Sequence, residues 1–292
     1  MPKPWRRGTR QRGDVAATDL TAGPAFVAPC EPVLVRAPPS GPEWLHEVKL
    51  DGYRMVLVID RGVARIHTKR GLDWTSRMPG IAQALSALKL RSAVIDGEAI
   101  MNGANGAPDF FALHAALAKG SAPDALLMVF DLMYLNGEDV RQIPLAQRRN
   151  MLLSFLRRSS PQLRFSHEVG GDGSAAFRAA CEIGLEGIVS KRRGSPYSSG
   201  KSDAWRKVKS TTTAHFAVLG YDRAGRSLRL ARLDQGELVG CGSAGSGLNE
   251  AAVRQIRAAI DAGRPVVVEV EHRGFSPDCE LRHPVIRSWE IG

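Results

Sequence analysis

Alternating polar and apolar residues recur through the first two thirds of the chain. Charged Glu47, Lys49 and Asp51 alternate with Val48 and Leu50, and this period of two is typical of a strand with one apolar face. Similar runs, bounded by turn residues, predict strands at 46–50, 53–59, 64–68, 93–100, 126–135, 163–169, 187–191 and 205–209.

Helical spacing of apolar residues interrupts these strands. The spacing predicts helices at 81–88, 150–157 and 175–183, the last ended by Gly184. Irregular mixing of strands and helices favours an α+β domain built on antiparallel sheets.

A third pattern follows the polar stretch 210–213. Short apolar runs at 215–221, 227–233, 237–241 and 265–272 surround one helix, with Asn249 as its expected N-cap and Gly263 as its end. Several short strands with one helix predict a small β-barrel such as the OB-fold. We therefore expect three parts: a flexible basic arm at 1–22, a larger domain at 23–210 and the small domain at 211–292.

Charge narrows the class of partner. The 292 residues carry a formal net charge of +10 and a pI near 9.8, which favours a polyanionic partner, above all nucleic acid. A generally basic protein without such a partner remains an alternative.

The cysteines are far apart and include no C-x-x-C pair, which argues against a zinc site or a disulfide framework. They are Cys30, Cys181, Cys241 and Cys279. No apolar run approaches the roughly 18 residues of a membrane span, and the basic N-terminus lacks the apolar stretch of a signal peptide. We therefore expect a cytoplasmic protein that does not contact a membrane.

The run Lys49-Leu50-Asp51-Gly52-Tyr53-Arg54 offers the first candidate chemistry. A nucleophilic lysine must be neutral near pH 7, although the ordinary pKa is about 10.4. Nearby cations lower that pKa. A solvated hairpin edge with a surface lysine fits this segment equally well.

Further charged groups end or interrupt the predicted strands. Lys69 and Arg70 provide two cations for phosphate contact, and Asp96 and Glu98 share one strand face as a carboxylate pair able to hold a hard divalent cation. Each pattern alone also fits a solvated strand.

The later strands add an aromatic ring and more charge. Phe130 lies in an apolar run, as a core residue or a stacking platform for a base. Glu186 precedes a short apolar strand, and Lys207 and Lys209 share one strand face. Two adjacent ammonium groups repel each other unless an anion lies between them.

The order of these motifs is more specific than any one of them. Lys-x-Asp-Gly-x-Arg, Asp-Gly-Glu, Phe-Asp-Leu, Glu-Gly-Ile-Val-Ser-Lys and Trp-x-Lys-x-Lys follow one another. This series resembles the covalent nucleotidyltransferases, and among them the ATP-dependent DNA ligases. It is most similar to the ligase module of bacterial ligase D and to stand-alone ligase C, over about residues 27 to 289. The resemblance implies a nucleotidyltransferase (adenylation) domain at 23–210 and an OB-fold domain at 211–292.

The resemblance also implies roles for individual residues. Lys49 would attack the α-phosphorus of ATP and become lysyl-AMP. Glu47 would contact adenine through its backbone, and Phe130 would stack on the adenine ring. Arg54 and Arg70 would contact AMP or the nick 5′-phosphate, Glu98 would bind the ribose or a metal, and Glu186 would help to hold the metal. Lys207 and Lys209 would bind the α-phosphate and stabilise charge in the transition state, and Arg282 would orient pyrophosphate.

The implied reaction has three steps. Lys49 takes AMP from ATP, AMP moves to the 5′-phosphate of a nick, and the 3′-hydroxyl displaces AMP, with Mg²⁺ or Mn²⁺ as Lewis acid. Nicked double-stranded DNA is the implied substrate, Ku or other repair proteins are implied partners, and we expect a monomer associated with the nucleoid. The basic tail expected in ligase D modules is not found after Pro284, so Arg282 would act alone or with Arg287.

Two other readings remain. An RNA ligase or a GTP-using capping enzyme would share the nucleotidyltransferase motifs. A non-catalytic nucleic-acid-binding module could keep the fold, although the presence of Lys49, Glu98, Glu186, Lys207 and Lys209 argues against it.

Overall fold

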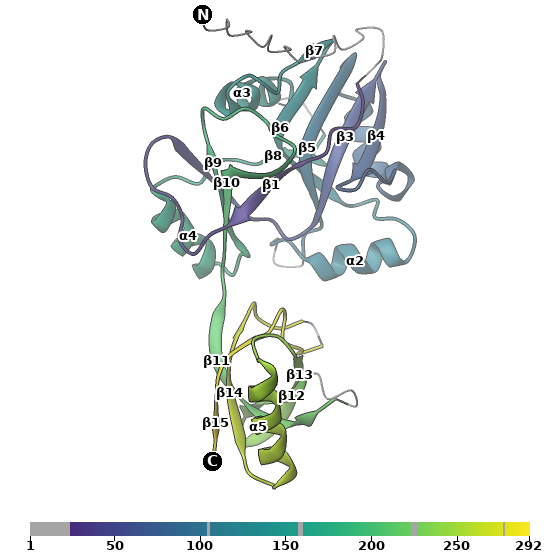
Figure 1. Ribbon diagram of the computed structural model, residues 1–292. Coiled ribbons are helices and arrows are strands. Elements are labelled where there is room, and N and C mark those ends of the chain that lie inside the picture. Colours follow the sequence, from purple (N-terminus) through teal and green to yellow (C-terminus); the bar gives the residue numbers. More distant parts are fainter. Residues whose placement is uncertain (1–23, 104–105, 157–159, 223–226, 277) are drawn as a thin grey trace, which may run out of the picture.

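The computed structural model describes residues 24–103, 106–156, 160–222, 227–276 and 278–292. The predicted arm at 1–22 lies outside the described residues. Figure 1 shows a larger N-terminal region (residues 24–209) and a smaller C-terminal region (residues 212–291), with the chain passing from one to the other between β10 and β11. The predicted domain boundary at 210 and 211 stays a prediction.

A six-stranded sheet forms the first half of the N-terminal region. Its order is β4-β3-β5-β6-β7, and β8 pairs with β6 in parallel while the other pairs are antiparallel. The strands are β3 (Tyr53–Asp60), β4 (Val63–Thr68), β5 (Ser92–Ile100), β6 (Leu126–Leu135), β7 (Glu138–Asp139) and β8 (Leu163–Phe165).

A four-stranded sheet of order β1-β10-β9-β2 packs against the first. Its strands are β1 (Cys30–Leu34), β2 (Trp44–Val48), β9 (Gly187–Arg192) and β10 (Gly200–Lys209). One buried apolar cluster joins the two sheets, because it takes Leu45 and Trp205 from this sheet and Val56 and Phe130 from the other.

Helices cover the outer faces of the two sheets. They are η1 (Thr75–Arg77), α1 (Pro79–Ser86), α2 (Phe110–Ala118), α3 (Leu145–Leu156) and α4 (Gly173–Glu182). The first three α-helices share the main apolar core with the six-stranded sheet, and α4 packs on β9 and β10 through Ala176, Ala180, Ile188 and Val208. Asp109 and Asp172 cap α2 and α4 by accepting a hydrogen bond from a first-turn backbone N–H.

The C-terminal region is one antiparallel sheet covered by a helix. Its order is β13-β12-β11-β14-β15. The elements are β11 (Thr212–Tyr221), β12 (Leu228–Asp234), β13 (Glu237–Ala244), α5 (Glu250–Asp261), β14 (Val266–His272) and β15 (Val285–Ile291). Asn249 caps α5 as predicted, and Ile256 and Ala259 pack the helix on the sheet. No closed barrel is found in the part of the chain that the structure describes.

The mixture of helices with antiparallel sheets confirms the predicted α+β class. Five elements were not predicted. They are β1, whose Pro32 interrupts the alternation, the three-residue helix η1, α2, which is apolar on nearly every side and has no helical stripe, the two-residue strand β7, and β15. The predicted strand 46–50 ends at Val48, and α3 begins at Leu145 rather than 150. No described helix is long and apolar enough to cross a membrane.

Candidate nucleotide-binding and catalytic site

Lys49 lies directly after β2, where three neighbouring strands bring their polar ends together. Its backbone N–H donates to the carbonyl of Gly187 at 2.8 Å, which ties it to the start of β9. Two glycines allow this close packing. A Cβ on Gly52 would lie 2.2 Å from the carbonyl oxygen of Ala99, and one on Gly187 would lie 2.1 Å from that of Val208. Only glycine fits at either position.

A cavity of about 250 Å³ opens on one side of Lys49, and we call it the inner cavity. It is lined by Pro29, Cys30, Glu31, Pro32, Glu47, Val48, Lys49, Leu50, Arg54, Lys69, Glu98, Phe130, Ser166, Val189, Lys191, Trp205 and Lys207. Most of these residues come from β1, β2, β9 and β10, so the four-stranded sheet provides most of its wall.

A buried charge network surrounds Glu47 in this wall. The Glu47 carboxylate accepts hydrogen bonds from Arg149, from Lys191 at 2.9 Å and from the Ser166 hydroxyl at 3.0 Å. Glu47, Lys191 and Ser166 are all buried. Burial lowers the pKa of Lys191, and the Glu47 carboxylate opposes that change. The network holds a carboxylate and an ammonium in fixed positions beside the cavity.

Aromatic rings line the same cavity. Phe130 and Trp205 meet edge to face, with ring centroids 6.0 Å apart. The Lys191 ammonium lies 4.1 Å from the centroid of the Phe130 ring, and the Arg54 guanidinium carbon lies 4.5 Å from it. The inner cavity therefore combines flat apolar surface with fixed polar groups, as small-ligand sites do.

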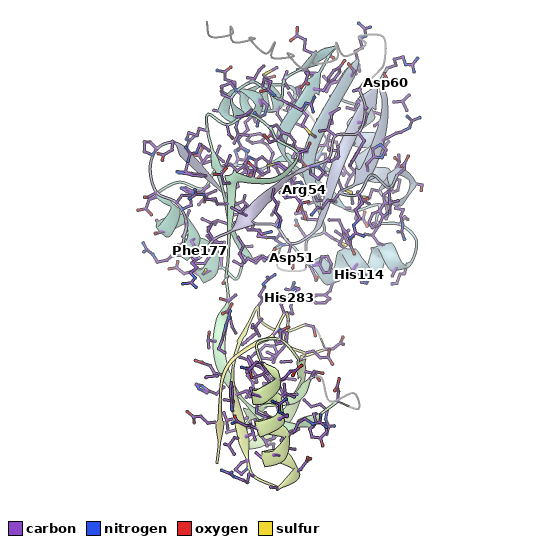
Figure 2. All side chains as sticks on the ribbon, in the orientation of Figure 1. Asp51, Arg54, Asp60, His114, Phe177 and His283 are labelled. Carbon is purple, nitrogen blue, oxygen red and sulfur yellow. The ribbon has the colours of Figure 1, made fainter. Side chains whose placement is uncertain are left out.

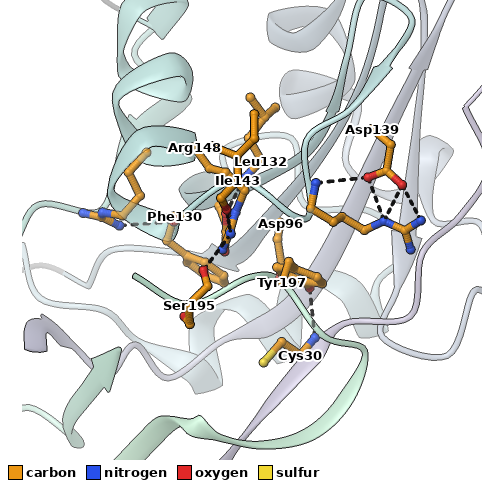
Figure 3. A network of polar contacts seen from close by, with 12 residues as sticks. Cys30, Asp96, Phe130, Leu132, Asp139, Ile143, Arg148, Ser195 and Tyr197 are labelled. Carbon is orange, nitrogen blue, oxygen red and sulfur yellow. Dashed lines mark hydrogen bonds and ion pairs between the residues drawn. The ribbon is translucent and has the colours of Figure 1, made fainter. Parts of the chain in front are cut away.

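A second buried network orients Arg54. Its guanidinium donates two hydrogen bonds, of 2.6 and 2.7 Å, to the Asp96 carboxylate. The Tyr197 hydroxyl also donates to Asp96 and accepts from the Cys30 backbone N–H at 2.9 Å; Figure 3 shows Cys30, Tyr197 and Asp96 in this order. Asp96 is fully buried and engaged. The hypothesis that Asp96 and Glu98 form a cation-binding pair is therefore wrong.

Glu98 faces the inner cavity from β5, and among the described residues none forms a hydrogen bond or ion pair with its carboxylate. Burial raises the pKa of this carboxyl from 4.5 to about 7, although Arg54 and Lys49 act in the opposite direction. Its protonation is therefore sensitive to pH near neutrality.

A second cavity, of about 270 Å³, lies on the other side of Lys49 between the two regions, and we call it the interface cavity. It is lined by Lys49, Asp51, Ala107, Pro108, Cys181, Gly184, Leu185, Glu186, Ser210, Thr212, Arg273, Gly274 and Arg282. Figure 2 shows Asp51 and His283 facing each other from the two regions.

Glu186 is the meeting point of the charges in this cavity. Its carboxylate forms an ion pair with Lys49, and it lies 3.2 Å from an Arg273 nitrogen and 3.7 Å from the Lys209 ammonium. Arg282 forms an ion pair with Asp51 across the regions. Lys209 has a lowered pKa, because of burial first and then of Arg273.

Most of the predicted site residues meet around Lys49. Six line the inner cavity: Glu47, Lys49, Arg54, Glu98, Phe130 and Lys207. Glu186 and Arg282 line the interface cavity with Lys49, and Lys209 reaches it through Glu186. Arg70 is exposed and is not a lining residue of either cavity; the neighbouring Lys69 lines the inner one.

Sequence reasoning missed several residues of the site. Arg149, Ser166 and Tyr197 act through buried hydrogen bonds to partners more than 100 positions away, which no local pattern predicts. Arg273 directly follows a strand and had no distinguishing signal.

The described residues contain no ready cluster of three or more His, Cys, Asp or Glu side chains that could hold a metal ion. Carboxylate oxygen is the ligand that Mg²⁺ and Mn²⁺ prefer, and Glu98 and Glu186 each supply one carboxylate, to the inner and the interface cavity respectively. Lys49, Lys209 and Arg273 already surround the Glu186 carboxylate.

A lysine between an aromatic cavity and a cationic cavity is the arrangement expected of a nucleotidyltransferase that forms a covalent lysyl intermediate. Comparison with known proteins agrees. Residues 33–209 match the model of the ATP dependent DNA ligase domain, and the chain belongs to this family.

Three individual proteins illustrate this similarity. The chain is 37% identical over 251 residues to the multifunctional non-homologous end joining protein LigD of Pseudomonas aeruginosa, covering 82% of this chain and 30% of that protein. It is 29% identical to the SPbeta prophage-derived DNA ligase-like protein LigB of Bacillus subtilis, covering 91% of this chain and all of that protein. Among solved structures, mycobacterial DNA ligase D complexed with ATP and MES is similar, with a TM-score of 0.59 and 25% identity over 90% of this chain and 94% of that chain. The chain thus spans less than a third of the LigD proteins' length.

Proposed function

We propose that this protein is an ATP-dependent DNA ligase that seals nicks between a 5′-phosphate and a 3′-hydroxyl through a lysyl-AMP intermediate, in DNA repair. One observation carries the proposal: the Lys49 side chain borders both an aromatic cavity with fixed polar groups and a cationic cavity that contains Arg282. Adenosine occupies the first cavity, and the β- and γ-phosphates of ATP extend into the second.

The inner cavity has the groups needed to bind adenine. Phe130 and Trp205 provide flat apolar surface. The Glu47 carboxylate and the Lys191 ammonium bond to each other in the wall of the cavity. The backbone of Glu47, which that network holds in place, is therefore the part of this residue that contacts adenine.

The charges around Lys49 suit transfer of AMP. The Lys49 ammonium is bonded to Glu186, which can accept a proton from it. Lys207 lines the inner cavity and Lys209 lies beside Glu186, so both can stabilise negative charge on the α-phosphate. Mg²⁺ or Mn²⁺, held by Glu98 and Glu186, would supply Lewis-acid activation of the phosphate.

The remaining parts of the proposal concern partners. A net charge of +10 suits nicked double-stranded DNA. The relatives named for non-homologous end joining support a role in that repair pathway, with Ku or other repair proteins as partners, for a monomer in the cytoplasm. We also propose an OB-type unit at 211–292, supported by the bridge between Ser246 and Val285, which brings the two edge strands toward each other.

Labelled ATP tests the central claim. With Mg²⁺ the protein should form a covalent AMP adduct, and Lys49→Ala should abolish it, because no other side chain supplies the nucleophile. Lys119→Ala, which removes an exposed lysine at the end of α2, should leave the adduct intact. An adduct that survives Lys49→Ala contradicts the assignment. Nick sealing on DNA against RNA, with ATP against GTP, then separates a DNA ligase from the related enzymes.

A further inference from the structure

Arg273 reaches the catalytic lysine's surroundings from the C-terminal region. It directly follows β14, and its guanidinium lies 3.2 Å from the Glu186 carboxylate of the N-terminal region. It lines the interface cavity together with Lys49 and Arg282. Its side chain is 21% exposed, so the ion pair is largely shielded from water.

The interface cavity has more positive than negative charge. Lys49, Lys209, Arg273 and Arg282 bring four cations, while Asp51 and Glu186 bring two carboxylates. A surplus of cations in a partly shielded cavity attracts a polyanion.

The pKa of His283 is lowered by burial and by the same positive charges. His283 directly follows Arg282, which lines this cavity, and burial lowers the pKa of its ring first, followed by Arg273, Lys209 and Arg282. Only Asp51 acts in the opposite direction. The positive field is therefore shared by both regions.

The polyphosphate chain of ATP would extend from Lys49 toward the interface cavity. Lys49 lines both cavities, so a nucleotide whose adenosine fills the inner cavity and whose α-phosphorus meets Lys49 places its terminal phosphates in the interface cavity. Arg287 does not help there, because it pairs with Glu271 and is exposed.

We infer that Arg273 binds the β- and γ-phosphates of ATP and the pyrophosphate released from it, as a second arginine beside Arg282. The inference rests on the proposed function. In the step that it assists, the Lys49 nitrogen forms a bond to the α-phosphorus, and the bond from that phosphorus to the bridging oxygen breaks. Pyrophosphate leaves with the electron pair, and the two protons that the nitrogen loses, one before and one after the attack, pass by Glu186 to water.

The reverse reaction tests Arg273 most directly. Adenylated protein is mixed with increasing inorganic pyrophosphate, and release of ATP is followed in wild type, Arg273→Gln, Arg273→Lys and the control Arg287→Gln. Loss of a charged hydrogen-bonding group should raise the half-saturating pyrophosphate concentration about 10- to 100-fold in Arg273→Gln. Arg273→Lys should recover part of the loss because it keeps the charge without the planar fork. Arg287→Gln should match wild type.

Competition by AMP against ATP separates this role from a structural one. AMP lacks the terminal phosphates, so its inhibition constant should be the same in Arg273→Gln and wild type. Equal weakening of AMP and pyrophosphate would show that Arg273 only holds the two regions together and would overturn the inference. An unchanged pyrophosphate response in Arg273→Gln, or faster adduct formation, would overturn it as well.

Two controls keep the outcomes distinct. Thermal unfolding identifies a misfolded Arg273→Gln, in which case Arg273→Lys with a normal melting temperature decides. A weakened pyrophosphate response with unchanged AMP competition supports the inference, and a wild-type pyrophosphate response or a loss of AMP competition overturns it. Absence of any adduct in wild type would instead refute the proposed function.

Discussion

The inner cavity and the interface cavity share Lys49 but are built in different ways. The inner cavity belongs to one region, and its charges, such as Glu47 with Lys191, are buried and hydrogen-bonded to neighbours within that region. The interface cavity joins two regions, and its ion pairs, Arg282 with Asp51 and Arg273 with Glu186, cross between them and stay partly exposed.

This difference suits the inner cavity to binding a ligand and the interface cavity to the chemical step. A cavity formed within one region stays shaped for its ligand whatever the other region does. A cavity lined by both regions exists only while they are in contact, so under the proposed function its arginines would leave when DNA enters.

Glu47→Ala should produce the largest loss of stability, because it leaves Arg149 and Lys191 buried without their carboxylate. Breaking a buried ion pair typically costs about 3–5 kcal/mol. The free energy of unfolding in urea measures the effect, and adenine binding should weaken with it.

The matched control is Glu271→Ala, which removes the carboxylate from an exposed pair with Arg287 in the C-terminal region. It should cost about 0–1 kcal/mol. Similar losses in the two variants would remove the contrast between buried and exposed charge on which the comparison rests.

Glu98→Gln should reveal a smaller, pH-dependent effect in the inner cavity. The folded-state pKa of Glu98 is about 7, above its ordinary value of 4.5. The folded state therefore binds this proton more tightly, and between these two pH values the wild type loses stability as pH rises. Glutamine cannot ionise, so Glu98→Gln should be about 1–3 kcal/mol more favourable relative to wild type at pH 8 than at pH 4, an upper range set by about 1.36 kcal/mol per pH unit.

Urea unfolding at pH 4, 6 and 8 measures this difference. It should be smallest at pH 4, grow through pH 6 and level off above pH 7. A difference that does not change with pH would mean that Glu98 ionises like an exposed carboxyl, and that the inner cavity is less shielded from water than its neighbours indicate.

The order of motifs predicted the site better than local patterns predicted the fold. The motif order grouped Lys49, Glu186 and Lys207, and the structure brings them around the two cavities, with Lys49 directly after β2, Glu186 directly before β9 and Lys207 within β10. The helix α2 was missed because Phe110–Ala118 is nearly all apolar and shows no stripe, and a helix with apolar residues all round has no periodic signal.

The partners of these motifs lie beyond sequence reasoning. Asp96 looked like half of a metal site, since a strand places it on the face of Glu98, but Arg54 and Tyr197, which are 42 and 101 positions away in the chain, engage it. Arg273 needed the position of the C-terminal region, which depends on contacts between regions and not on any pattern near residue 273.

Glu31→Gln should have the smallest effect, because it concerns the exposed rim of the inner cavity. Glu31 on β1 accepts a hydrogen bond from Lys69 at 2.9 Å, and the two side chains are 39% and 51% exposed. That hydrogen bond lowers the pKa of Glu31, so the pair stabilises the folded state above the ordinary pKa of the carboxyl and loses this contribution as pH falls through the lowered value. We expect less than about 1 kcal/mol at pH 7 and nothing at pH 2. A double-mutant cycle with Lys69→Met isolates the pair, and a coupling above about 2 kcal/mol would show that this rim is as firmly held as the Glu47 network.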